Sequence, residues 1–343
     1  MDSAACGPVN ATGREAGLRF ACTLDGQGGC RYLDWAGVRA WRQGDGVLWV
    51  HLERDVPEVQ DWVTAECGID PVSCRALLAE ESRPRVEDVG NALLVVLRGV
   101  NLGVDDDPDD VSPDQDLVPI HLWVEEHRVI SLRDRGHHLI ALREIRDAFA
   151  KLRGPASAGG LLVKIAEKLV KYAEPIIDQL EEEVDVLEDK LTQIEPEETR
   201  KRLADIRHAA IELRRYLTPQ REALIHMQVE EVGWLSRKNR THLRECADKV
   251  QRHIESLEAI RGRATVLHED LTAVTTERIA KASHRLSILA ALVLPPSLLA
   301  GIFGANLGGI PGSQAPWAFA ILVLLILVLL PIELWVLKRL KWF

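Results

Sequence analysis

The distribution of charge is the feature that most constrains this chain. Between Leu286 and Leu337 the sequence carries one charged residue, Glu333, so nearly all charge lies in the first 285 residues. Eighteen apolar residues form a helix about 27 Å long, which is enough to cross the hydrocarbon core of a bilayer. This region holds two such runs, which we predict to be membrane spans: Leu286–Phe303 and Trp317–Leu337. A purely soluble protein and a carrier with many spans are both excluded.

Basic residues flank the two runs on their outer sides. Lys281 and Arg285 precede the first run, and Lys338, Arg339 and Lys341 follow the second. Because cytoplasmic flanks carry the excess of Lys and Arg, we expect both termini in the cytoplasm and the uncharged loop 304–316 outside. The N-terminus shows no apolar run behind a basic start, so we expect no signal peptide and a cytoplasmic front part.

The front part, residues 1–160, mixes strand and helix patterns and predicts a cytoplasmic α/β domain. Its apolar runs of strand length are 47–52, 92–97, 120–124 and 128–132, the last two forming a hairpin, and its helical spacings are 59–67 and 71–80. The acidic stretch 105–116 lacks the Gly and Glu of a calcium loop and predicts a solvated loop. The six cysteines contain no CxxC pair, so we expect reduced thiols.

Residues 161–280 predict a helical stalk. Strong helical spacing runs from Leu161 to Leu191, and a second helix follows the Glu195–Pro196 turn until Pro219 kinks or interrupts it. From about Arg237 the spacing resumes without a proline before Pro295, so one helix, on the order of 80 Å long, is expected to run into the membrane. A long helix with one apolar stripe needs neighbours, which come from an oligomer, from the preceding helices, or from both.

Two spans can anchor a domain or line a pore, and the first span favours the pore. Pro295 and Pro296 remove backbone hydrogen bonds, from which a mere anchor gains nothing. Steps of three and four place small and weakly polar residues on one face, which can line a narrow hole between symmetry copies or pack tightly on another helix. The candidate pore-lining residues are Ser283, Leu286, Ala290, Leu294, Ser297 and Gly301.

A family resemblance points the same way. Gly304-Ala305-Asn306, after a span with two prolines, resembles the Gly-Met-Asn signature of the CorA family of divalent-cation transporters, and the basic-aromatic end 338–343 is similar to that family's. The loop Asn306-Leu-Gly-Gly-Ile-Pro-Gly resembles most closely the ZntB branch of zinc transporters, as do the segments 98–102 and 122–131. Ala305 stands where methionine is typical, and the loop lacks the acidic residues common in the magnesium type, which favours the zinc type.

The resemblance implies an α+β membrane protein that assembles as a homopentamer in a bacterial inner membrane. The first span would line the pore, and five copies of Asn306 would ring its outer mouth. An amide oxygen can hydrogen-bond the water shell of a dication, whereas a tightly held zinc prefers His or Cys, and neither occurs from Leu286 to Phe343. We therefore expect a largely hydrated Zn²⁺, no tight metal site and no cofactor, with Leu286 and Leu294 as apolar constrictions. Magnesium or cobalt transport is the alternative.

The residues do not show how transport would be coupled to a source of energy. The resemblance implies protons as a further partner, but no acidic residue lies on the candidate pore face. Glu333 is the lone intramembrane carboxylate, and we expect it to pair with Lys338 or with a basic flank of another subunit.

The competing class is a membrane-tethered sensor or scaffold, which leaves the uncharged loop with its Asn306 unexplained. The acidic balance, a net charge of -10, argues against nucleic acid. Gly26–Gly29 lacks a phosphate-binding lysine and no nucleophile–base arrangement occurs, so we expect no enzyme.

Overall fold

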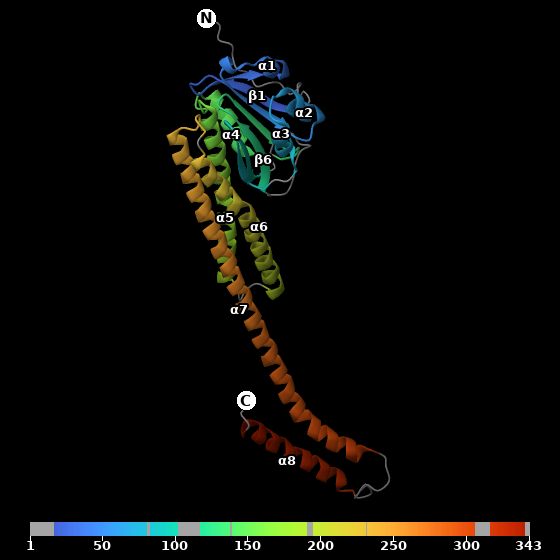
Figure 1. The fold of residues 1–343 in the computed structure, drawn as a ribbon. Helices are drawn as coiled ribbons and strands as arrows, with labels where there is room; N and C mark the ends of the chain where they lie inside the picture. Colours follow the sequence, from blue (N-terminus) through green and yellow to red (C-terminus); the bar gives the residue numbers. More distant parts are fainter. Residues whose placement is uncertain are drawn as a thin grey trace. The chain divides into compact units, whose positions relative to one another are not determined.

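The computed structural model describes residues 17–80, 83–101, 117–137, 139–190, 195–230, 232–305 and 316–339 (Figure 1). The acidic stretch 105–116 and Asn306 lie outside these residues. The chain divides into two compact units, residues 1–266 and residues 267–343.

The first unit is built on a seven-stranded sheet whose order is β2-β1-β3-β7-β6-β5-β4. Neighbouring strands are antiparallel except for β3 and β7, which pair in parallel with Val50 opposite Ile130. The strands are β1 (Leu18–Leu24), β2 (Cys30–Leu33), β3 (Val47–Glu53), β4 (Arg85–Val89), β5 (Ala92–Val100), β6 (Leu117–Val124) and β7 (Arg128–Arg133).

The four predicted strands and the predicted hairpin are therefore confirmed, as β3, β5, β6 and β7. The pattern missed β1, β2 and β4. The last two are the edge strands, and side chains at an edge are only partly covered, so β2 and β4 lack an apolar run that would mark them.

One face of the sheet is covered by short helices. They are α1 (Trp35–Ala40), α2 (Pro57–Asp61), the π-helical turn η2 (Trp62–Glu66) and α3 (Pro71–Leu78), while the 3₁₀ turn η1 (Gln43–Asp45) precedes β3. Asp34 caps α1 and Asp70 caps α3 by accepting backbone hydrogen bonds. Val59, Trp62 and Leu77 from these helices join Val50 and Leu132 of the sheet in one core cluster. The predicted helices 59–67 and 71–80 are thus confirmed within a few residues.

The opposite face is covered by α4 (Ile140–Ala150), α5 (Ala158–Asp189) and α6 (Pro196–Val229), of which α5 and α6 contact β5. Helix α5 begins three residues before the predicted Leu161, because the Ser157 hydroxyl accepts a hydrogen bond from the backbone N–H of Gly160. Gly99 of β5 lies so close to α5 that an added Cβ would stand 2.3 Å from Leu169 Cδ2.

Of the kink or interruption expected at Pro219 in the second stalk helix, the interruption is wrong, because α6 continues through Pro219 to Val229. Proline in a helix interior costs about 3 kcal/mol through a lost hydrogen bond and a clash. Leu217, Gln220 and Leu224 are buried on either side of it, so packing against the rest of the unit outweighs the local cost.

Helix α7 (Arg237–Gly304) is one continuous helix of 68 residues, as the unbroken spacing predicted. Up to residue 266 its apolar stripe, including Val250 and Leu257, is buried within the first unit, so the preceding helices cover this stretch of the stripe. Two ion pairs join this stretch of α7 to α5. His242 Nδ1 lies 3.1 Å from Glu167, and Arg263 Nη2 lies 2.5 Å from Asp185.

The second unit consists of the end of α7 and of α8 (Ala318–Arg339). Both helices are long and apolar enough to cross a membrane. Helix α7 ends at Gly304, next to the end of the predicted span 286–303, and α8 covers nearly the same residues as the predicted span 317–337. The division of the chain into parts 1–160, 161–280 and 281–343 remains a prediction about the roles of these segments.

Candidate functional site

Within the second unit, α7 presents two different stripes. Ile288, Leu292, Pro295 and Leu299 recur at steps of three and four and are half-buried. On α8 the less exposed residues Leu322, Ile326, Leu330, Glu333 and Leu337 recur in the same way. Because residues three and four apart share one face of a helix, we infer that these two stripes face each other.

The predicted pore-lining residues form a different stripe. Leu286 is 67% exposed and Leu294 is 65% exposed. Ser283, Ala290, Ser297 and Gly301 are exposed as well, so α8 covers no member of this face. A face that lines a pore between copies must be free in the single chain, and a face toward lipid is free too. The pore-lining assignment therefore stays a prediction.

The signature residues lie where the first span ends. Gly304 is the last residue of α7, and Ala305 follows it in a bend. A Cβ built on Gly304 would meet no atom of the described residues within 4 Å, so packing against these residues does not demand glycine there. Asn306 lies outside the described residues, and its role at the outer mouth stays a prediction.

Of the two partners expected for Glu333, Lys338 and a basic flank of another subunit, the single chain bears on the first alone. Both carboxylate oxygens of Glu333 are buried, and neither accepts a hydrogen bond from the described residues. Among the described residues Glu333 does not pair with Lys338, because residues five apart lie on different sides of a helix. The Arg339 side chain packs over the Trp335 ring, with its guanidinium carbon 5.3 Å from the ring centre.

Among the described residues, no group of three or more His, Cys, Asp and Glu side chains is arranged to hold a metal ion. The described cysteines Cys22, Cys30, Cys67, Cys74 and Cys246 are free thiols. Burial raises the pKa of Cys246 to about 12 and that of Cys74 to about 11, which disfavours the thiolate that binds zinc.

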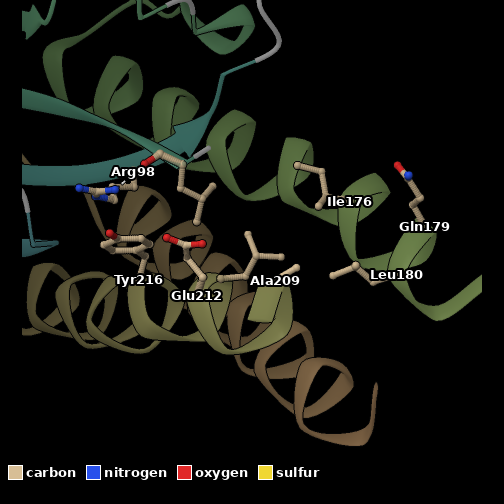
Figure 2. A pocket seen from close by; sticks show the side chains of 9 residues that line it. Arg98, Ile176, Gln179, Leu180, Ala209, Glu212 and Tyr216 are labelled. Atoms are coloured by element: carbon tan, nitrogen blue, oxygen red, sulfur yellow. Dashed lines mark hydrogen bonds between the residues drawn. The ribbon is translucent and has the colours of Figure 1, made fainter. Parts of the chain in front are cut away.

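A cavity of about 260 Å³ lies between α5, α6 and the ends of β5 and β6 (Figure 2). Arg98 lies flat over the Tyr216 ring, with the guanidinium carbon 3.8 Å from the ring centre. The backbone N–H of Arg98 donates a 2.7 Å hydrogen bond to Gln220 Oε1. Glu212 supplies the one carboxylate of the lining, so the cavity has no ligand set for a cation of its own.

A buried polar network crosses the centre of the sheet. Ser131 Oγ donates to the Val50 carbonyl, accepts from Trp49 Nε1 at 3.0 Å, and lies 2.9 Å from His51 Nδ1. Burial and the positive charge of Arg133 hold the pKa of His51 well below its ordinary value, so the ring is neutral. Sequence reasoning missed this network because its members come together only through the pairing of β3 with β7.

The comparison with known families decides between the two classes left open by the residues. The family profile described as CorA-like Mg2+ transporter protein matches residues 44–339. The chain belongs to this CorA-like family. It is therefore a membrane transporter of a family that moves divalent cations.

Individual relatives cover nearly the whole chain. The protein named Zinc transport protein ZntB from Pectobacterium atrosepticum is 36% identical over 96% of this chain and 97% of its own length. The protein named Divalent cation transporter CmaX from Pseudomonas aeruginosa is 32% identical over 96% of this chain and 98% of its own length. These names confirm the resemblance to the CorA family and its ZntB branch.

Solved structures agree with the fold. The full-length CmaX structure has a TM-score of 0.81 at 32% identity and covers 96% of this chain and 100% of its own. The CorA magnesium transporter of Methanocaldococcus jannaschii has a TM-score of 0.75 at 17% identity over 94% of this chain and 98% of its own. The latter likeness shows the fold alone, an α/β domain, a long helix and two C-terminal apolar helices.

Proposed function

We propose that this chain takes Zn²⁺ across a bacterial inner membrane through a homopentameric pore lined by the membrane part of α7. The observation that carries the proposal is the stripe of small and weakly polar residues on α7 that α8 leaves uncovered. Five copies of such a stripe around an axis would bury it and leave a narrow hole. Leu286 and Leu294 would form the apolar constrictions.

The outer mouth would select the ion through Asn306. Five neutral amide oxygens can hydrogen-bond the water shell of a dication without holding it so strongly that conduction stops. Since the described residues contain no metal-binding group of three side chains, nothing in them favours a dehydrated zinc ion over a hydrated one. The ion would therefore pass largely hydrated.

Zinc is the proposed cargo because the relative at 36% identity is named a zinc transporter. The family description names Mg²⁺, and CmaX is named for divalent cations in general, so magnesium or cobalt is the alternative cargo. In this arrangement residues 1–160 and the stalk 161–280 lie in the cytoplasm with both termini, and the loop 304–316 faces outward. The positive residues on the outer flanks of both spans support this orientation.

Uptake into proteoliposomes that contain a fluorescent metal reporter tests the proposal. We expect a zinc signal well above that of protein-free liposomes, and smaller signals for magnesium, cobalt and nickel at equal concentration. The matched control is the Asn306→Ala variant reconstituted at equal density, which should resemble protein-free liposomes. A magnesium or cobalt signal that exceeds the zinc signal would replace the cargo, and no signal for any of the four ions would contradict transport.

A further inference from the structure

Cys22 and Cys30 lie on neighbouring strands of the sheet. In the pairing of β1 with β2, Cys22 lies opposite Tyr32, and Leu24 lies opposite Cys30. Residues directly opposite each other share one face of a sheet, and so do residues two apart along a strand. Cys22 and Cys30 are therefore diagonal neighbours on one face, a position from which side chains can reach each other.

The two thiols differ in their access to solvent. Cys22 is 1% exposed, whereas Cys30 is half-buried. Strand β2, which carries Cys30, is an end strand of the sheet, and of the described strands it pairs with β1 alone. A reagent in water can therefore reach Cys30 more easily than Cys22. Strand β2 can also move closer to β1 without breaking the pairing of another described strand.

The surroundings of Cys30 favour its thiolate. The Cys22 thiol lowers the pKa of Cys30, and the Tyr32 hydroxyl lowers it further, although partial burial acts in the opposite direction. Interaction with Cys30 and burial raise the pKa of Cys22, so Cys22 keeps its proton. Because the thiolate is the nucleophilic form of cysteine, the half-buried member of the pair is the more reactive one.

We propose that Cys22 and Cys30 form an oxidant-sensitive thiol pair that hydrogen peroxide converts to a disulfide. The Cys30 sulfur attacks one peroxide oxygen, the O–O bond breaks, and Cys30 becomes a sulfenic acid while hydroxide leaves. The Cys22 sulfur then bonds to the Cys30 sulfur, the S–O bond breaks, and the Cys22 proton leaves with the hydroxyl group as water. Two electrons pass from the two thiols to the peroxide, and a thiol reductant returns them.

A second pair of cysteines provides an internal comparison. The thiols of Cys67 and Cys74 both donate to the Val63 carbonyl, at 2.8 and 3.1 Å, so their sulfurs are also near each other. Both thiols are buried, and burial raises the pKa of each. Buried thiols with a raised pKa are inert, so proximity alone does not make an oxidisable pair.

Oxidation of the full chain in detergent by hydrogen peroxide, followed by alkylation and tryptic digestion, tests the proposal. Residues 20–31 form one tryptic peptide that holds Cys22 and Cys30, and residues 55–75 form another that holds Cys67 and Cys74. A disulfide leaves both of its cysteines unalkylated, and a thiol reductant applied before alkylation restores them. We expect the peptide 20–31 to lose alkylation at least about tenfold faster than the peptide 55–75.

Two variants separate a thiol pair from a merely reactive Cys30. Cys22→Ser should leave Cys30 as a sulfenic acid, which dimedone captures, and Cys30→Ser should leave Cys22 a thiol. Equal loss of alkylation in the two peptides, no loss in either, or a disulfide that joins two copies would overturn the proposal. Dimedone capture in the wild-type chain at the yield of Cys22→Ser would overturn it too, because Cys22 would then not react with the sulfenic acid. The test needs no transport, so its outcome is independent of the zinc proposal.

Discussion

His121 makes the stability of the first unit depend on pH. It lies on β6, where it is 1% exposed, and its Nδ1 donates a 2.9 Å hydrogen bond to the Leu77 carbonyl at the end of α3. Its Nε2 is buried and has no hydrogen-bond partner among the described residues. Burial and the nearby charge of Arg54 lower the pKa of His121 to about 4.

The sign and the size of the effect follow from this pKa. An unfolded histidine binds a proton below about pH 6.5, whereas the folded ring stays neutral until about pH 4. The unfolded state therefore gains protons first as the pH falls, and the free energy of unfolding decreases. Between pH 7 and pH 4.5 the expected loss from this residue is about 2 kcal/mol.

Urea unfolding of the fragment 1–266, followed by circular dichroism at both pH values, measures this loss. The matched variant is His121→Gln, whose neutral amide can still donate to the Leu77 carbonyl. We expect the wild-type fragment to lose about 2 kcal/mol more than the variant over this interval. His51 is also held neutral by burial, and its contribution to the pH dependence is the same in the wild-type and variant fragments, so it cancels in the comparison. Equal losses in the two fragments would refute the reasoning.

Four further outcomes are expected. Native mass spectrometry in mild detergent should give a pentamer, and a monomer or dimer would contradict both the pore and the stalk argument. Asn306→Ala should abolish zinc uptake and leave assembly intact, and an unchanged rate would make Asn306 a turn residue only. With the native cysteines removed, Ser297→Cys should make transport sensitive to small impermeant thiol reagents while Leu298→Cys should not, and the reverse would disprove the assigned face. Gly99→Ala should lower the free energy of unfolding by about 1–3 kcal/mol, since the new methyl group would lie 2.3 Å from Leu169 Cδ2, and an unchanged urea midpoint would disprove the clash.

Local patterns were sufficient for the elements that depend on a single segment. Helix α7 follows from apolar spacing without a proline before Pro295, and the spans follow from the length of two apolar runs. Strands β3, β5, β6 and β7 are central and apolar, so they too are visible in the sequence. The family follows from residues around Asn306, although the structure does not describe that residue.

The sequence by itself therefore determined the membrane segment, the long helix, the strands β3, β5, β6 and β7 and the family, because each depends on neighbours along the chain. Only the tertiary structure decided the rest. Pro219 stays inside α6 because buried neighbours outweigh a local cost. The Glu333 carboxylate oxygens are buried without a hydrogen-bond donor among the described residues, and the pKa of His121 is lowered, because residues distant in the sequence exclude water from these groups. Exclusion of water is a property of packing in space, and no spacing along the chain encodes it.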